Sequence, residues 1–260
     1  MKIAILYICT GKYNIFWKDF YLSCEKYFIT DIEKEYFVFT DADIIDFEEN
    51  KNIHKIYQND LGWPDNTLMR YEMFLKQKEL ILKTDYTFFF NANALFIKMI
   101  SKDEFLPDDT ERFTAAIHPG FYKYSIDKFP YERNSGSLAF INFDDGHYYF
   151  QGAINGGLTK DFVQALELMN SNIKTDKENG IVAIWHDESH WNKFLSDKPY
   201  IKKLSSSYIY PENLDLPFEK IILMRDKNKY GGHNNLRGEK LKFKGVVVKI
   251  IKKIIKKIIN

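Results

Sequence analysis

The sequence predicts an α/β domain with a mainly parallel sheet. Short continuous apolar runs at 3–9, 35–40 and 86–90 are typical of strands that are covered on both faces. Helical patterns at 16–27 and 68–82 separate these runs. An alternation of strands with helices is the pattern of a parallel α/β sheet, because parallel neighbours need a crossover connection.

Polar residues follow each of the three predicted strands. They are Thr10–Tyr13, Thr40–Asp43 and Asn91–Asn93. In open α/β sheets, ligands bind beyond the carboxyl ends of the strands, and those ends meet at one edge of a parallel sheet. We therefore expect the three polar segments to share one crevice.

The second half of the chain has more turns. A glycine-rich stretch at 151–157 indicates only that something approaches the backbone closely, and a helix at 161–169 follows it. A turn at Asn179-Gly180 leads into an apolar strand at 181–185, after which a helix begins with Asp187 as its N-cap. No internal repeat or linker interrupts the chain before about residue 240, so we predict a single domain over 1–240.

Composition excludes several classes of protein. Hydrophobic residues make up 45% of the chain, which excludes a disordered or fibrous protein. Two cysteines, Cys9 and Cys24, cannot form a disulfide framework and indicate a reducing compartment. The formal net charge of +1 includes eight lysines and no acidic residue within 240–260, so the residues before 240 carry −7. A body that acidic is a poor binder of nucleic acid across a broad face.

The amino-terminal segment predicts a buried strand rather than a targeting signal. Its apolar run is short, and no small-residue cleavage site follows it. No segment of the sequence reaches the roughly 18 apolar residues of a spanning helix. We therefore expect a cytoplasmic protein.

Residues 185–192, Trp-His-Asp-Glu-Ser-His-Trp-Asn, form the densest group of titratable side chains. They lie where a helix begins, and a helix N-terminus favours anions and presents free backbone donors. A structural interpretation is also open, in which Asp187 caps the helix, Glu188 lies in its first turn and both histidines are packed polar residues. His186 and His190 have the spacing of a zinc protease motif, but Asp187 stands where that motif needs glutamate. No third ligand follows at a useful spacing.

Several blocks occur in an order that resembles glycosyltransferase family six, which includes the histo-blood-group A and B transferases and the α1,3-galactosyltransferases. The resemblance covers roughly residues 1–240. The matching blocks are Lys12-Tyr13, Met69-Arg70-Tyr71-Glu72-Met73, His118-Pro119-Gly120-Phe121-Tyr122, Tyr131-Glu132-Arg133, Tyr148-Tyr149-Phe150-Gln151-Gly152-Ala153 and Trp185-His186-Asp187-Glu188-Ser189-His190-Trp191-Asn192-Lys193.

The resemblance implies a GT-A fold, in which a nucleotide-binding sheet is continuous with an acceptor-binding part. It implies transfer of galactose or N-acetylgalactosamine (GalNAc) from a uridine diphosphate (UDP) sugar to the 3-position of a β-galactoside, with retention of the α-configuration. Glu188 is then the catalytic carboxylate. By position, Ile8, Cys9, Thr10 and Tyr13 bind the uridine side, Arg70 contacts the donor sugar, His118, Trp185 and Asp187 grip the sugars, and Lys227, Lys229 and Arg237 lie in the stretch that closes over the diphosphate.

One departure from the family changes the expected cofactor. Mammalian members carry Asp-x-Asp after the central strand, and its carboxylates hold Mn²⁺ on the diphosphate. This chain has Asn91-Ala92-Asn93 instead. A neutral amide is a poorer ligand for a hard cation than a carboxylate, so we expect an enzyme that needs no divalent metal, as in the bacterial branch of the family. The two asparagines then hydrogen-bond phosphate or ribose directly.

Donor and acceptor follow from the same resemblance. Family members read the C2 substituent of the sugar at Gln151, Gly152 and Ala153. Gly152 leaves space for an N-acetyl group and Ala153 takes some away, so UDP-GalNAc is the predicted donor and UDP-Gal the alternative. The default acceptor carries Fucα1-2Gal, although Pro130 and Pro211 replace polar residues of the blood-group enzymes. A non-catalytic sugar-nucleotide or glycan-binding module is a further alternative.

The last twenty residues, 241–260, form a basic amphipathic pattern. Within it the stretch Val-Val-Val-Lys-Ile-Ile-Lys-Lys-Ile-Ile-Lys-Lys-Ile-Ile at 246–259 places isoleucines on one helical face and lysines on the other. This pattern predicts peripheral binding to an anionic membrane surface such as the inner membrane face. An oligomer-forming or frayed tail is the alternative.

Overall fold

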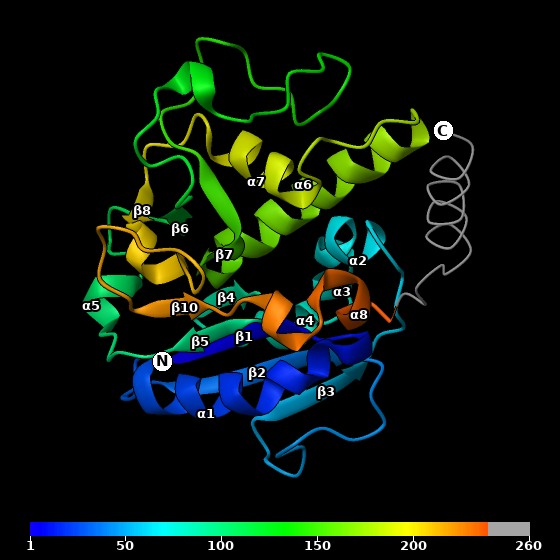
Figure 1. Cartoon of the computed structure of the whole chain (residues 1–260), viewed down its shortest axis with the longest axis vertical. Coiled ribbons are helices and arrows are strands. Elements are labelled where there is room, and N and C mark those ends of the chain that lie inside the picture. Colours follow the sequence, from blue (N-terminus) through cyan, green and yellow to red (C-terminus); the bar gives the residue numbers. More distant parts are fainter. Residues whose placement is uncertain (239–260) are drawn as a thin grey trace, which may run out of the picture.

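The computed structural model describes residues 1–238, so the predicted tail at 241–260 lies outside the described residues. The described chain is organised around a seven-stranded sheet in the order β3-β2-β1-β4-β7-β6-β8 (Figure 1). Four of the six strand pairings are parallel, and only β7 runs against its neighbours. The prediction of an α/β fold with a mainly parallel sheet is confirmed. The strands are β1 Lys2–Ile8, β2 Glu33–Thr40, β3 Ile53–Tyr57, β4 Tyr86–Phe90, β6 Phe113–Ile117, β7 Phe150–Leu158 and β8 Ile201–Leu204.

Helices cover both faces of this sheet. Successive residues of a strand point to opposite faces, and in β1 Ile5 and Tyr7 pack against one hydrophobic cluster whereas Ala4 and Leu6 pack against another. The first cluster includes α1, and the second includes α3, α6 and α7, which lie on the opposite side of the sheet (Figure 1). The central strands β1 and β4 are therefore almost wholly apolar, as the sequence indicated, whereas the edge strands β3 and β8 carry exposed polar residues. These helices are α1 Trp17–Tyr27, α3 Arg70–Leu75, α6 Thr159–Glu178 and α7 Asp187–Leu195.

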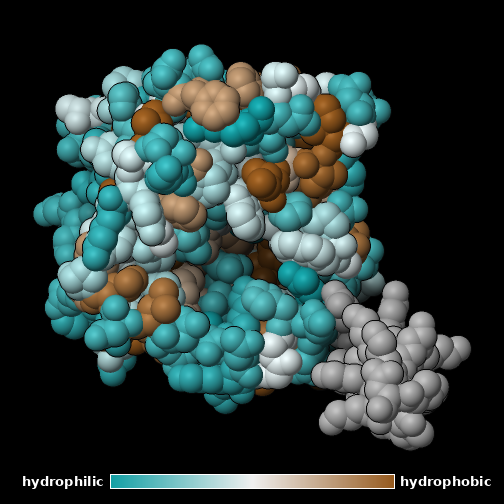
Figure 2. Space-filling model, turned by 45° about the horizontal axis from the view of Figure 1, so that its top comes forward, coloured by the Kyte–Doolittle hydropathy of each residue, from teal (hydrophilic) through white to brown (hydrophobic). Residues whose placement is uncertain are grey.

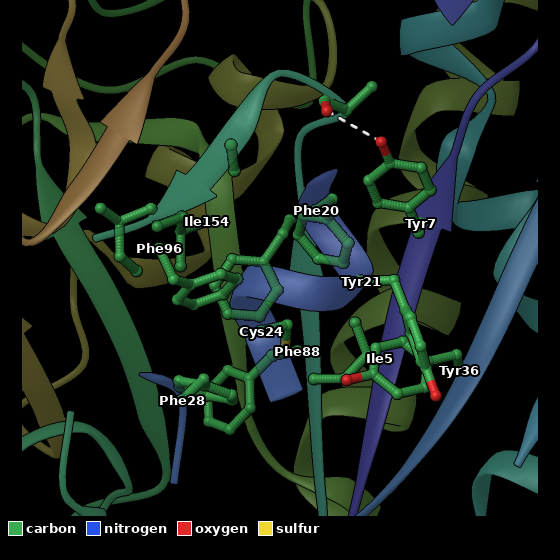
Figure 3. Close-up of a cluster of buried hydrophobic side chains, with 14 of the residues drawn as sticks. Ile5, Tyr7, Phe20, Tyr21, Cys24, Phe28, Tyr36, Phe88, Phe96 and Ile154 are labelled. Carbon is green, nitrogen blue, oxygen red and sulfur yellow. Dashed lines mark hydrogen bonds between the residues drawn. The ribbon is translucent and has the colours of Figure 1, made fainter. Parts of the chain in front are cut away.

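Aromatic side chains fill the core between α1 and the sheet. Phe20 lies 4.4 Å from Tyr7 between ring centroids, and Phe28 and Phe96 pack beside them (Figure 3). The hydroxyl of Tyr7 donates a hydrogen bond of 2.8 Å to the carbonyl of Ala92 (Figure 3). Burial of each such ring contributes about 1.5–3 kcal/mol to the free energy of unfolding. This packing fixes the ends of β1 and β4, where the polar segments begin.

A second, three-stranded sheet lies on the α1 side and carries the C-terminal part of the described chain. Its order is β5-β10-β9. Short helices complete the fold. The elements are β5 Ala94–Phe96, β9 Tyr210–Pro211, β10 Ile222–Met224, α2 Asp65–Leu68, α4 Lys78–Ile81, α5 Lys102–Phe105 and α8 Gly232–Leu236, with 3₁₀ turns at Gly11–Phe16, Ile126–Lys128, Ser206–Ile209 and Lys227–Tyr230.

Two predicted elements differ from the structure. The predicted helix over 68–82 is divided among α2, α3 and α4. The predicted strand over 181–185 is wrong, because this segment forms turns whose backbone groups bond elsewhere. The N–H of Ile181 donates to the carbonyl of Asp176, and that of Ile184 donates to the carboxylate of Glu132. An apolar run does not become a strand without a neighbouring strand to pair with.

The glycine-rich stretch at 151–157 lies within β7, and the prediction of a close backbone approach is confirmed. A Cβ added to Gly156 would lie 2.2 Å from the carbonyl oxygen of Thr87 on β4. No other residue fits there without displacing the backbone.

One face of the described chain is mostly polar. In Figure 2 hydrophobic side chains form separate patches on an otherwise hydrophilic face. Within residues 1–238 no helix has both the length and the apolar character that a membrane crossing requires.

Candidate active site

A cleft made of two adjoining cavities lies at the edge of the sheet where β1 and β4 end and β7 begins. The cavities have volumes of ≈ 250 and ≈ 170 Å³ and share the lining residues Trp63, Thr67, Arg70 and Asn91. The first cavity is also lined by Ile8, Thr10, Tyr13, Asn66, Phe89, Ala92, Lys227, His233 and Arg237. The second is also lined by Gln151, Gly152, Ala153, Trp185, His186, Asp187 and Glu188.

The expected crevice is thus present, with two of the three polar segments in its wall. Thr10, Tyr13 and Asn91 line the first cavity. The segment after β2 supports it from behind, since Asp41 accepts a hydrogen bond of 2.8 Å from the N–H of Gly11.

The first cavity is positively charged. Arg70, Lys227 and Arg237 line it together. Burial, and then the charges of Arg237 and Arg70, lower the pKa of Lys227 to about 8. The Lys227 ammonium lies 5.4 Å from the ring centroid of Tyr13, and the Arg237 guanidinium lies 4.0 Å from that of Trp63. Like charges held together at a partly buried site are stabilised by a bound anion.

Arg70 joins the two cavities and is fixed from several sides. Its Nη1 donates to the carbonyl of Gly152 at 2.9 Å, its guanidinium lies 4.4 Å from the ring centroid of Phe89, and its Nε lies 2.9 Å from the Asp187 carboxylate. The Nε–H itself points at the carbonyl of Thr67, at 3.3 Å. The contact with Asp187 is therefore an ion pair and not an aligned hydrogen bond.

Asp187 is a buried carboxylate that retains capacity to accept hydrogen bonds. It is 1% exposed, and neither of its oxygens has a hydrogen-bond donor among the described residues. Burial raises its pKa to about 7, and the charge of Arg70 opposes this rise. A buried acceptor without a donor is costly, so a ligand that brings hydroxyl groups into the second cavity is favoured.

Glu188 is held at both carboxylate oxygens. The hydroxyl of Tyr149 donates to Oε1 at 2.6 Å, and the N–H of Gly152 donates to Oε2 at 2.7 Å. Burial raises the pKa of Glu188, and these two hydrogen bonds lower it. A Cβ on residue 152 would lie 3.1 Å from the Cβ of Glu188, so the glycine permits this approach.

The loop before α7 holds a strained backbone at the cavity. His186 has φ 55° and ψ −126°, a region that side-chain-bearing residues rarely adopt. The adjoining N–H groups are fixed: Ile184 donates to Glu132 at 2.7 Å, and Trp185 donates to the hydroxyl of Ser189 at 3.0 Å. This backbone path brings both Trp185 and Asp187 to the cavity wall.

The helix prediction for this segment is confirmed over Asp187–Leu195, but the capping role of Asp187 is wrong. His186 is the N-cap residue, without a side-chain capping bond, and Asp187 is the first residue of the helix. Its carboxylate is paired with Arg70 instead. The carboxylate that the capping interpretation placed on the helix N-terminus therefore forms an ion pair with Arg70.

Four predicted site residues do not line this cleft. The side chain of Cys9 is buried in the core, and the amide of Asn93 donates to the carbonyl of Arg225 at 2.7 Å. Lys229 extends outward and pairs with Glu212 at 2.7 Å. His118 lies behind Tyr149, with 5.6 Å between the ring centroids. The side chains of these four residues therefore lie outside the cleft, and their predicted binding roles stay predictions.

Sequence reasoning missed several residues of the cleft. Trp63, Asn66, Thr67 and His233 come from loops and short helices without a recognisable pattern. Tyr149 lies inside a matching block, Tyr148–Ala153, but nothing in that block marks its hydroxyl as the partner of Glu188.

Neutral amides stand at the end of β4, the segment on which the expectation of metal independence rests. Asn91 lines the cleft, whereas Asn93 is 6% exposed and its amide nitrogen donates to the carbonyl of Arg225. Within the described part of the chain, no three His, Cys, Asp or Glu side chains form a group that could hold a metal ion.

Comparison with known proteins identifies the family of this chain. The model for "Glycosyltransferase family 6" matches residues 1–237. The chain belongs to glycosyltransferase family 6. The resemblance seen in the sequence is therefore confirmed, and the α/β fold with its mostly parallel sheet is that of a GT-A-like glycosyltransferase.

Family 6 relatives come from bacteria and animals. The chain is 37% identical to the O-antigen biosynthesis glycosyltransferase WbnI of Escherichia coli, over 91% of this chain and 100% of that protein. It is 30% identical to globoside α-1,3-N-acetylgalactosaminyltransferase 1 of Gallus gallus, over 88% of this chain and 68% of that protein. It is 29% identical to histo-blood group ABO system transferase 2 of Rattus norvegicus, over 82% of this chain and 64% of that protein.

Proposed function

We propose that this family 6 protein is a retaining, metal-independent α1,3-N-acetylgalactosaminyltransferase. It would move GalNAc from UDP-GalNAc to the galactose 3-OH of a Fucα1-2Gal acceptor. The observation that carries the proposal is the continuity of the cleft. A cationic cavity suited to a diphosphate adjoins, through Arg70, a cavity that contains Asp187 and the doubly held Glu188.

The cations of the first cavity supply the charge for the departing diphosphate. Lys227 and Arg237 lie on the C-terminal segment, and Arg70 lies on α3, so the three would contact the anion from different sides. Fixed cations that stabilise charge developing on a leaving group lower the barrier without further reorganisation. Asn91 adds a neutral hydrogen-bonding amide to the wall of the same cavity.

Glu188 would act on the sugar. Glycosyl transfer passes through an oxocarbenium-like transition state, and retention requires either a covalent intermediate or attack from the face of the leaving group. The Glu188 carboxylate is the nucleophile in the first route. In the second it stabilises the cationic sugar while the leaving diphosphate oxygen takes the proton of the acceptor hydroxyl. Asp187, whose oxygens accept no hydrogen bond from the described residues, would accept hydrogen bonds from sugar hydroxyls.

The GalNAc assignment rests on the names of relatives, since those from Gallus gallus and Homo sapiens are N-acetylgalactosaminyltransferases. One observation favours UDP-Gal as a second candidate. The space left by the missing side chain of Gly152 is occupied by Glu188 and is not open to an N-acetyl group. The methyl group of Ala153, in the same cavity, further restricts the space near the sugar.

The acceptor would approach from the side of Trp185. This indole is 47% exposed and lines the second cavity, and an exposed aromatic face suits stacking against a sugar ring.

We also propose that the protein is cytoplasmic and that residues 241–260 bind an anionic membrane surface. Deletion of 241–260 should release the protein from anionic vesicles and leave transfer intact.

The test is UDP release from UDP-GalNAc and UDP-Gal in excess EDTA, with and without a fucosylated galactoside. Release stimulated by the acceptor in EDTA supports a metal-independent transferase, and the faster donor decides between the two sugars. If no UDP is released in EDTA and addition of Mn²⁺ restores the release, the proposal of metal independence is refuted. If the protein binds UDP but turns over neither donor with fucosylated or unfucosylated galactosides, the result supports the non-catalytic module.

A further inference from the structure

Tyr149 contacts the carboxylate of Glu188, the proposed catalytic group, from the aromatic cluster that contains Tyr131. It lies directly before β7, is 1% exposed, and its hydroxyl donates to Oε1 of Glu188 at 2.6 Å. Its ring is packed among His118, Phe121 and Tyr131, with centroid separations of 5.6, 5.2 and 5.6 Å. A ring enclosed in this way has one accessible orientation, so the position of its hydroxyl is fixed.

Several groups act on the ionisation of Glu188. Burial raises its pKa, whereas the N–H of Gly152, the hydroxyl of Tyr149 and the charge of Arg70 lower it. Asp187 is its neighbour on α7, and its charge together with that of Glu188 acts on Tyr149, as does Tyr131. Burial and Glu188 raise the pKa of Tyr149 well above its ordinary value, so the phenol keeps its proton and remains a donor.

We propose that Tyr149 is a positioning residue for the transfer reaction, which holds the Glu188 carboxylate in its working orientation and keeps it ionised. This inference rests on the proposed function, because it assigns Tyr149 a role through Glu188. A carboxylate that stabilises or attacks a cationic sugar must be ionised and correctly aimed. Tyr149 provides both through one short hydrogen bond, and Gly152 secures the other oxygen.

The variant Tyr149→Phe removes only the hydroxyl and keeps the packed ring. A hydrogen bond to a charged group contributes enough that its loss should lower kcat about 10- to 100-fold at neutral pH. The KM for the donor should change little, because the cations of the first cavity are unaffected. The acidic limb of the pH–kcat profile should move to higher pH, because Glu188 loses a bond that favours its ionised form.

The matched control is Tyr131→Phe. Tyr131 lies in the same aromatic cluster, and its hydroxyl donates to the carbonyl of Tyr148 at 2.6 Å without contact to Glu188. A general loosening of the cluster would affect both variants equally. The proposal requires that the acidic limb move in Tyr149→Phe and stay in place in Tyr131→Phe, with thermal unfolding recorded for both.

A second variant covers the case in which Tyr149→Phe does not fold. Fluorotyrosine at position 149 keeps ring and hydroxyl but is a stronger donor, so it should move the acidic limb to lower pH. The inference is wrong if the wild-type protein transfers sugar and the folded variants at position 149 keep its profile. If the wild-type protein does not transfer sugar to any acceptor, the proposed function fails instead.

Discussion

Lys227 gives the proposed diphosphate site a pH dependence that can be measured. Burial beside Arg237 and Arg70 lowers its pKa to about 8 in the free protein. The charged form binds the diphosphate, and a bound anion restores the pKa toward the ordinary lysine value near 10.4. Affinity is therefore highest below pH 8 and falls as the pH rises through 8, and binding takes up a proton at pH 8–9.

The size of the effect follows from the fraction of protonated lysine. With a pKa of about 8, this fraction drops about tenfold between pH 7 and pH 9. The Kd for UDP should rise about tenfold over the same interval. Phosphate groups, with a second pKa of about 6, are already ionised throughout it.

The assay is isothermal titration calorimetry with UDP at pH 7, 8 and 9. In Lys227→Arg the guanidinium stays charged, so the ratio of wild-type to variant affinity isolates the titration of Lys227 from that of Asp187. Lys229→Met is the control on the same segment, since Lys229 pairs with Glu212 outside the cleft and should not matter. An identical pH dependence in wild type and Lys227→Arg would refute the role of Lys227.

Three further outcomes are expected. Glu188→Gln should retain UDP affinity in calorimetry, but its transfer rate should fall by about a hundredfold or more, as is typical when a group that stabilises transition-state charge is removed. Near-normal transfer would exclude Glu188 as the catalytic residue. Gly152→Ala places a methyl group 3.1 Å from the Cβ of Glu188, so kcat should fall about 10- to 100-fold with unchanged UDP affinity; an unchanged kcat would show that the site tolerates the shift. Asn93→Ala removes a buried bond to the carbonyl of Arg225 and should lower the free energy of unfolding by about 1–3 kcal/mol in urea, whereas Asn91→Ala should weaken UDP binding and leave stability nearly unchanged; equal effects of the two would contradict their separation.

Local patterns in the sequence were sufficient for three of the seven strands of the main sheet and for the family. The runs at 3–9, 35–40 and 86–90 became β1, β2 and β4 because a strand buried on both faces must be apolar throughout, which is visible in a single chain. The polar residues after them reached one edge of the sheet because parallel strands end together. The block at 185–192 also supplied Asp187 and Glu188 to the cleft.

Long-range partners decided the rest, and the sequence does not contain their positions. Asn91 and Asn93 are two residues apart, yet one lines the cleft and the other bonds to Arg225, which is 132 residues away. Lys227 turns toward Tyr13, while Lys229 extends to Glu212. Direction and burial of a side chain depend on what packs against it, so chemically equal residues acquire different roles only in the folded chain.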